Sequence, residues 1–255
     1  MPEFEHLLTE SRGHVAYLTL NRPEVLNAIN PAVLAELTEA MRRFRDNPDL
    51  WVAVLTGTGE RAFCAGWDLK WHAANPEASR ALRPSAGPLA DCWKPIIAAV
   101  NGYAVGGGLE LALDCDIIVA VEDARFGVPE PRRGQMTDKG AQRLPRILPL
   151  KLAMGLLLTG KLIDAAEAYR VGLINEVVPR EQLMAAAERW AEEILECSPL
   201  AIQATKQAAI QDLARLIEEG RARPYSLQGR LRDSQDFVEG PRAFAERRKP
   251  VWTGR

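Results

Sequence analysis

Apolar and polar residues alternate along the first part of the chain as they do in half-exposed strands. Residues 14–20, HVAYLTL, alternate with period two, and the following Asn-Arg-Pro ends this predicted strand. After an Asn-Pro start signal, apolar residues recur at helical spacing over residues 31–44. Residues 51–57, WVAVLTG, predict another strand. The order of strand, helix and strand favours a mixed α/β layer.

A glycine-rich turn lies at the centre of the chain. Residues 95–100, PIIAAV, predict a buried strand, and residues 109–113 predict a short helix. Between them stand three consecutive glycines at positions 106–108. Because each glycine costs about 1 kcal/mol relative to alanine inside a regular element, this run indicates a close approach to the backbone.

The start of this predicted helix can support chemistry. Its unpaired N–H groups and the positive end of its dipole favour an oxyanion. Glu110 follows Gly107 by three residues, so the two share one face of the first turn. A carboxylate beside an anion-stabilising amide suits proton transfer next to a carbonyl. The alternatives are a glycine packing device and a phosphate cradle, although the Lys-Ser or Lys-Thr of a P-loop is missing.

A second segment, upstream of the glycine-rich turn, could contribute to the same binding site. Residues 63–70, FCAGWDLK, bring an apolar strand end to Ala65 and Gly66, whose backbones could face the same ligand. Together with PIIAAVNGYAVGGGLELAL at 95–113 and FGVPE at 126–130, in this order and spacing, the segment resembles the crotonase superfamily. The most similar branch is the enoyl-CoA hydratase/isomerase family. The resemblance extends from NRPEVLNAI, which begins at residue 21, almost to the end of the chain.

The resemblance implies an α/β fold. It would be a crotonase-like spiral of ββα units over residues 1–178, carrying an acyl-CoA site, followed by a helical trimerisation region over 179–255. The sequence agrees, because 180–196 and 200–218 carry the apolar stripes of two amphipathic helices and no strand signal follows. Their apolar faces need partners, so we expect a homo-oligomer, either a trimer or a dimer of trimers.

The resemblance also implies the residues of the site. The N–H groups of Trp67 and Gly107 would stabilise the thioester oxygen, and Glu110 and Glu130 would be the acid/base carboxylates. Lys70 has a second interpretation as a surface charge. The substrate-binding residues implied by the matching motifs, with the last two nearby on the coenzyme A path, are Ala65, Gly66, Trp67, Asp68, Leu69, Lys70, Gly107, Arg22 and Val25.

Both glutamates together favour a hydratase. It would add water in syn fashion to a 2-enoyl-CoA thioester, or dehydrate a 3-hydroxyacyl-CoA in reverse, without a cofactor because coenzyme A belongs to the substrate. An isomerase that shifts a double bond with one glutamate, and a catalytically silent binding subunit, remain alternatives. The family's usual glycine-rich run after the second glutamate is replaced by GQMTDKGAQRL at 134–144, one residue shorter. Asp138 and Lys139 replace small residues there, which suggests an unusual acyl group.

Two other segments leave their roles open. The basic residues after Glu130 are either a solvated surface or cations that perturb Glu130 or meet a polar acyl group. Residues 71–93, rich in alanine and proline, predict a surface excursion. The resemblance implies that this segment would help to shape the acyl pocket.

Composition narrows the remaining classes. The chain of 255 residues has a net charge of −2, which provides no global attraction for nucleic acid. The first residues, MPEFEHLLTE, do not resemble a signal peptide, and no stretch has the roughly 20 apolar residues of a membrane helix. We therefore expect a cytoplasmic protein. No metal is expected, because metal-ligand spacing is missing from the scattered Cys64, Cys92, Cys115, Cys197, His6, His14 and His72.

Overall fold

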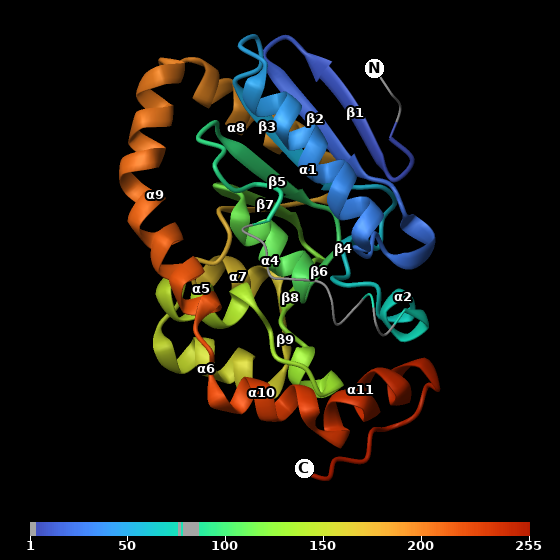
Figure 1. Ribbon diagram of the computed structural model, residues 1–255. Coiled ribbons are helices and arrows are strands. Elements are labelled where there is room, and N and C mark those ends of the chain that lie inside the picture. Colours follow the sequence, from blue (N-terminus) through green and yellow to red (C-terminus); the bar gives the residue numbers. More distant parts are fainter. Residues whose placement is uncertain (1–3, 76–77, 79–86) are drawn as a thin grey trace.

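The computed structural model describes residues 4–75, 78 and 87–255 and contains two β-sheets with helices around them (Figure 1). The first sheet has the order β1-β2-β3-β5-β7-β10, and only the β1–β2 pair is antiparallel. The central strands are buried along almost their whole length, which explains their nearly continuous apolar sequences. The six strands are β1 (Leu7–Arg12), β2 (Val15–Leu20), β3 (Val52–Gly57), β5 (Ile96–Val100), β7 (Ile117–Val121) and β10 (Glu176–Val178).

A second sheet of short strands lies beside the first. Its order is β4-β6-β8-β9, with only β9 antiparallel to its neighbour. Each long strand β3, β5 and β7 is followed in the chain by a short strand of this sheet and then by a helix. This repeat confirms the expected ββα units. The strands are β4 (Ala62–Cys64), β6 (Tyr103–Val105), β8 (Arg125–Gly127) and β9 (Leu162–Asp164).

Helices α1 and α7 each begin after a residue whose side chain acts as an N-cap. The Asn30 side chain accepts a hydrogen bond from the Val33 N–H, and Asp164 caps α7 in the same way through the Glu167 N–H. The α-helices are α1 (Pro31–Asp46), α2 (Leu69–Ala74), α4 (Gly107–Asp114), α5 (Lys139–Ile147), α6 (Leu150–Thr159), α7 (Ala165–Arg170), α8 (Leu183–Leu195), α9 (Pro199–Ala222), α10 (Ser226–Asp233) and α11 (Gln235–Ala245). Three short 3₁₀ segments are η1 (Pro23–Val25), η2 (Glu130–Arg133) and η3 (Arg180–Gln182).

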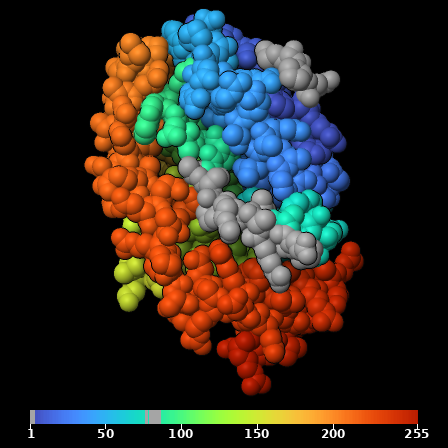
Figure 2. Space-filling model, in the orientation of Figure 1, coloured from blue at the N-terminus to red at the C-terminus, as the bar shows by residue number. Residues whose placement is uncertain are grey.

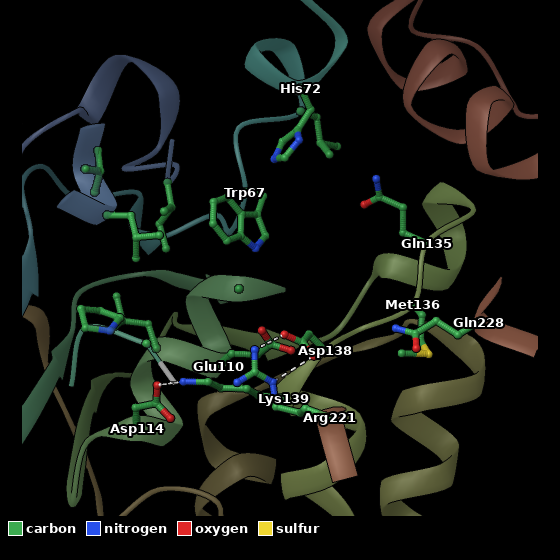
Figure 3. A pocket seen from close by; sticks show the side chains of 18 of the residues that line it. Trp67, His72, Glu110, Asp114, Gln135, Met136, Asp138, Lys139, Arg221 and Gln228 are labelled. Carbon is green, nitrogen blue, oxygen red and sulfur yellow. Dashed lines mark hydrogen bonds and ion pairs between the residues drawn. The ribbon is translucent and has the colours of Figure 1, made fainter. Parts of the chain in front are cut away.

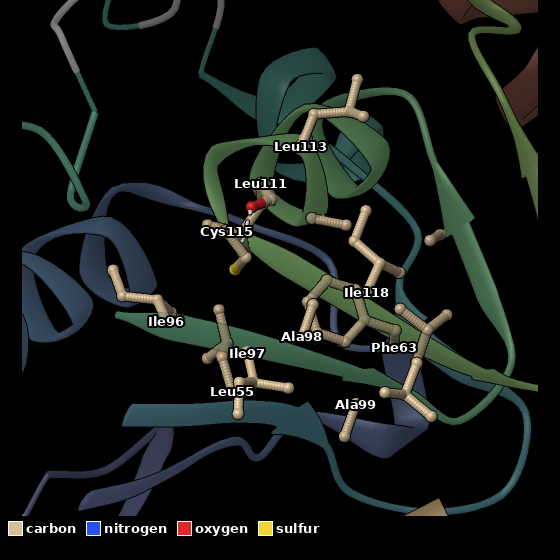
Figure 4. Close-up of a cluster of buried hydrophobic side chains, with 14 of the residues drawn as sticks. Leu55, Phe63, Ile96, Ile97, Ala98, Ala99, Leu111, Leu113, Cys115 and Ile118 are labelled. Carbon is tan, nitrogen blue, oxygen red and sulfur yellow. Dashed lines mark hydrogen bonds between the residues drawn. The ribbon is translucent and has the colours of Figure 1, made fainter. Parts of the chain in front are cut away.

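The core fixes α4 against the first sheet. Side chains from β3, β5 and β7, among them Leu55, Ile97 and Ile118, pack with Leu111 of α4 and Phe63 of β4 (Figure 4). Nearly every residue of α4 is buried. The first turn of this helix therefore has a fixed position and orientation, which a site built on its N–H groups requires.

The helical region after β10 has two parts. Helix α8 packs on β3, β5 and β7 with Leu183, Ala186, Ala187 and Ala191 in the core. Helices α9, α10 and α11 continue along one side and the lower border of the molecule (Figures 1 and 2). No strand follows β10 in the described part of the chain. The domain boundary at residue 178 stays a prediction, and α8, which follows it in sequence, shares the core of the sheet.

Some expected elements differ in the structure. Strand β1 was not predicted, because only its first residue is buried, so an edge strand of this kind shows no alternation. Strand β10 covers only Glu176–Val178, and the buried Leu173 and Ile174 precede it. Of the surface excursion expected at 71–93, residues 76–77 and 79–86 lie outside the described residues. No helix in the described ranges is both long and apolar enough to cross a membrane.

Candidate active site

A cavity of about 520 Å³ opens beside the first turn of α4 (Figure 3). Trp67 and His72 lie on one side of it, and Glu110 and the start of α5 lie on the other. Four of the predicted site residues line it directly: Trp67, Leu69, Gly107 and Glu110. The cavity therefore joins the two segments, 63–70 and 95–113, that the sequence identified separately.

These two segments meet backbone to backbone. A Cβ on Gly66 would lie 2.8 Å from the Val105 carbonyl oxygen and 3.0 Å from the Gly107 nitrogen. A Cβ on Gly108 would lie only 2.0 Å from the Cys64 carbonyl oxygen. Gly66 also has a φ of +85°, a conformation that other residues rarely adopt. The glycines are thus required by a close approach of two chain segments, as the sequence predicted.

Two backbone N–H groups lie at this junction. Ile29 forms a parallel bridge with Trp67, donating to the Gly66 oxygen and accepting from the Asp68 nitrogen. By the alternation of a strand, this arrangement directs the Trp67 N–H away from Ile29. In the part of the chain that the structure describes, neither the Trp67 N–H nor the Gly107 N–H has an assigned acceptor. Two neighbouring donors of this kind can receive one oxygen atom.

Glu110 is a buried carboxylate with two hydrogen-bond donors on one oxygen. Its Oε1 accepts from the Thr137 hydroxyl and from the Gly140 N–H, each at 2.8 Å. Burial raises the pKa of Glu110, whereas these two hydrogen bonds oppose the rise. Since both donors bind the same oxygen, the carboxylate is held in one orientation at the wall of the cavity.

Glu130 has very different surroundings, although it lies close by. Its Oε1 would be 3.0 Å from a Cβ placed on Gly106, the residue that precedes α4. Within the described residues its Oε2 is buried and has no hydrogen-bond partner. Burial, and then the charge of Glu110, raise the pKa of Glu130 to about 8. At neutral pH Glu130 therefore carries a proton that it can donate.

The residues expected along the coenzyme A path are arranged around Asp68. Asp68 caps α2 by accepting from the Trp71 N–H at 3.1 Å, and its other oxygen pairs with Arg22 at 3.2 Å. Arg22 also donates to the Ala28 carbonyl oxygen. Lys70 is exposed. The expected residues that do not line the cavity are Arg22, Val25, Ala65, Gly66, Asp68, Lys70 and Glu130.

Cations after Glu130 have acidic or carbonyl partners elsewhere. Lys139 and Arg143 both pair with Asp114 at the end of α4, and Arg132 donates to the Thr159 carbonyl oxygen. None of them is a cause of the Glu130 pKa shift, in which burial and Glu110 raise the pKa. The interpretation that these cations perturb Glu130 is therefore wrong.

The C-terminal helices close the cavity, which the sequence did not reveal. Arg221 of α9, Gln228 and Leu231 of α10, and Phe237 of α11 all line it. The apolar stripe of α1 was visible in the sequence, but the stripe did not show that Val33, Leu34 and Leu37 would face a cavity. Helical periodicity marks a face as buried without saying what covers it.

The described residues contain no group of three or more His, Cys, Asp or Glu side chains that could hold a metal ion. The chemistry that the arrangement can perform is proton transfer. One carboxylate is fixed and ionisable, one carboxylic acid lies near it, and two N–H groups can hold an oxyanion.

Comparison with known families agrees with this site. The sequence matches the family described as enoyl-CoA hydratase/isomerase over residues 10–255. The chain therefore belongs to this family, and its fold is the crotonase fold of mixed α/β structure with a C-terminal helical region.

Individual relatives narrow the class. The chain is 46% identical over 250 residues to (E)-benzylidenesuccinyl-CoA hydratase from Thauera aromatica, covering 96% of this chain and 98% of the relative. It is 42% identical over 267 residues to carnitinyl-CoA dehydratase from Proteus mirabilis, covering 100% of both. The solved structure of a carnitinyl-CoA dehydratase from Mycobacterium avium has a TM-score of 0.86 at 41% identity, covering 98% of this chain and 99% of that one. These hydratases and dehydratases are hydro-lyases, which confirms the expected enzyme class.

Proposed function

We propose that the protein adds water to the double bond of a 2-enoyl-CoA thioester, or removes water from a 3-hydroxyacyl-CoA. The observation that carries this proposal is the difference between the two neighbouring carboxyl groups. Glu110 is held by two donors, whereas Glu130 has a raised pKa of about 8 and a buried oxygen with no partner in the described residues. Carboxyl groups whose environments differ in this way can act as base and acid in one reaction.

Each group has one role in the hydration. Glu110 takes a proton from water as the new C–O bond forms at the β-carbon. The electrons of the double bond move toward the thioester, where the N–H groups of Trp67 and Gly107 stabilise the charge on oxygen. Glu130 then gives its proton to the α-carbon. In the dehydration the same protons move in reverse, so no separate cofactor is needed.

The acyl group carries a polar substituent. Gln135 and Gln228 line the cavity opposite Trp67, and the Asp138–Arg221 ion pair lies at its wall (Figure 3). Placing a wholly apolar chain against the two glutamine side chains would leave their amide groups without water, at a cost of roughly 1–3 kcal/mol for each. A substituent with hydrogen-bonding atoms avoids this cost.

An acyl-CoA panel tests the reaction. Purified protein is incubated at catalytic concentration with straight-chain, aromatic and polar 2-enoyl-CoA thioesters, and the products are weighed by mass spectrometry. Gain of one water supports the proposal, and a faster reaction with polar acyl groups supports the substrate class. A shifted double bond at constant mass indicates an isomerase, and binding without turnover indicates a silent subunit. Either result contradicts the hydration.

We also propose that the protein assembles into a trimer or a dimer of trimers. The support is an apolar row that one chain leaves uncovered on α6, where Leu150, Met154 and Leu158 are exposed at helical spacing. Light scattering at micromolar concentration should give three or six times the mass of one chain. A stable monomer would contradict the assembly, and Leu158→Glu should shift a true assembly toward smaller species.

A further inference from the structure

Two adjacent residues of opposite charge, Asp138 and Lys139, are held from opposite sides. Lys139 Nζ donates to Asp114 Oδ2 at 2.6 Å, which ties the start of α5 to the end of α4. Asp138 Oδ1 accepts from Arg221 Nε at 3.0 Å, which ties the same point to α9. Both ion pairs are visible at the base of the cavity (Figure 3). The start of α5 is therefore fixed between two other helices.

The contact with α9 is buried at its Arg221 end, whereas the Asp138 side chain is 40% exposed. The Arg221 side chain is only 4% exposed, and it also pairs with Glu218 one turn earlier. Next to it, a Cβ on Gly220 would lie 2.4 Å from Oε1 at the end of the Gln142 side chain, so α9 and α5 are in contact here. An ion pair in such surroundings holds its geometry better than an exposed one.

Directly on either side of this dipeptide stand the two donors to Glu110. Thr137 precedes Asp138, and Gly140 follows Lys139; both bond to Glu110 Oε1 at 2.8 Å. Their distance to the carboxylate depends on where the backbone of residues 137–140 lies. That position is set by the two ion pairs.

We propose that Asp138 and Lys139 form a clamp that positions Glu110, with Arg221 as its anchor on α9. The clamp rests on the proposed function, in which Glu110 is the general base. It keeps Thr137 and Gly140 against Oε1, so that Oε2 is the oxygen presented to the reacting water. Thr137, Asp138, Lys139 and Arg221 are positioning residues, because they act through Glu110.

The charged groups around Glu110 determine whether loosening the clamp raises or lowers the pKa of Glu110. The groups that surround it are Glu130 of η2, Asp138 and Lys139 of α5, Asp114 of its own helix, His72 across the cavity and Arg221 behind Asp138. Both hydrogen bonds favour the ionised form, whereas Asp138 disfavours it. Loosening the clamp, or removing Arg221 from Asp138, therefore raises the pKa of Glu110 and leaves less base at neutral pH.

The Thr137 hydroxyl gives the most direct test. Thr137→Val removes one hydrogen bond to the carboxylate and should raise the pKa of Glu110 by about one unit. The pKa is measured without catalysis from the carbon-13 shift of labelled glutamate carboxyls, with the Glu110 signal assigned by its loss in Glu110→Gln. Hydration kcat near neutral pH should fall about tenfold with KM changed less than about twofold. Thr137→Ser keeps a hydroxyl and should restore most of both quantities.

The anchor on α9 gives the second test. Arg221→Met should move the pKa of Glu110 and kcat in the same directions as Thr137→Val, and Arg221→Lys, which keeps one charge, should move them less. The matched control is Arg215→Met, which removes an exposed ion pair with Glu219 from the same helix. A merely structural role of Arg221 would lower the melting temperature without changing the pKa of Glu110.

The outcomes separate the clamp from the reaction. A Glu110 pKa in folded Thr137→Val within about 0.3 unit of wild type overturns the clamp, whatever the activity. Equal kcat and Glu110 pKa in folded Arg221→Met, Arg215→Met and wild type overturn the proposed role of Arg221. Wild-type protein that hydrates no acyl-CoA overturns the proposed function instead, and the carboxyl titration still decides whether the clamp holds Glu110.

Discussion

Asp68 and Glu130 are two acidic residues near the same junction of backbones, and their surroundings differ in one respect. Asp68 has a partner for each oxygen, the Trp71 N–H and the Arg22 guanidinium. Glu130 keeps one buried oxygen without a partner in the described part of the chain. A carboxylate that pairs with a cation from another segment holds the two segments together. A carboxyl that is buried without a partner keeps its proton, because burial disfavours the charge.

This difference is also a difference in what each group can do. Donating a proton at neutral pH requires a pKa near the working pH, and Glu130 has a pKa of about 8. Asp68, in contrast, is paired with the Arg22 guanidinium. The two residues therefore allow direct tests of which acidic groups carry the chemistry.

The largest expected effect comes from the two glutamates. Glu110→Gln and Glu130→Gln should each lower kcat by at least about 10², because each removes a proton acceptor or donor and keeps nearly the same shape. Binding of the thioester should change much less. Steady-state kinetics and titration with a non-reacting acyl-CoA measure the two quantities. Wild-type hydration by Glu130→Gln would show that the second carboxyl is not the acid.

The glycines of the junction separate chemistry from folding. Gly107→Ala would place a Cβ 3.3 Å from Trp67 Cδ1, so the indole must shift by a few tenths of an ångström and hydration should fall about tenfold. Gly107→Val should cost about 10² or more while the protein stays folded by circular dichroism. Gly108→Ala is the contrasting variant. Its Cβ would lie 2.0 Å from a backbone oxygen, so it should lower the yield of folded protein.

If Gly107→Val has nearly wild-type activity, the Gly107 N–H does not contact the reacting carbonyl. If Gly108→Ala folds as well as Gly107→Ala, the close approach of the two segments does not constrain this turn.

Breaking the Arg22–Asp68 pair should lower stability more than it lowers kcat. Both side chains are mostly buried, at 14% and 11% exposure, so Arg22→Met leaves Asp68 without its cation and should lower the free energy of unfolding by about 1–3 kcal/mol. We expect kcat to fall less than about threefold, since neither group donates a proton. Chemical denaturation and kinetics on one preparation compare the two effects. A loss of 10² in kcat at unchanged stability would place this pair in the chemistry.

The smallest effect concerns stability against pH. The pKa of Glu130 rises from 4.5 to about 8 on folding, so the native state binds one proton more than the unfolded state between these values. The stability from protonated Glu130 is complete below pH 4.5 and is lost as the pH rises to about 8. Glu130→Gln does not titrate. Its melting temperature relative to wild type should therefore rise by several degrees over this range.

Thermal denaturation at a series of pH values measures this difference. The comparison variant is Asp68→Asn, which keeps Glu130 as wild type does, so its melting temperature relative to wild type should show no such trend over the same range. A constant difference between Glu130→Gln and wild type would mean that Glu130 is ionised in the folded protein at neutral pH.

The sequence alone determined most of the fold. Period-two and helical patterns located the strands β2, β3 and β5 and the helices α1, α4, α8 and α9, since those patterns follow from which face of an element is buried. The glycines at 106–108 and Gly66 indicated a close approach, which the backbone contacts at Gly66 and Gly108 confirm. The two glutamates came from motifs whose order and spacing resemble a family.

Only the tertiary structure showed which charged residues form ion pairs. Asp68 and Glu130 look alike in sequence, and Arg22 lies 46 positions from the carboxylate that it neutralises. Asp138 and Lys139 stand out in the sequence as a departure, but their partners Asp114 and Arg221 come from two other helices. The closure of the cavity by α9 to α11 was equally invisible. The reason is physical: periodicity records burial along one element, whereas the pKa of a buried group depends on charges and donors brought near it from distant parts of the chain.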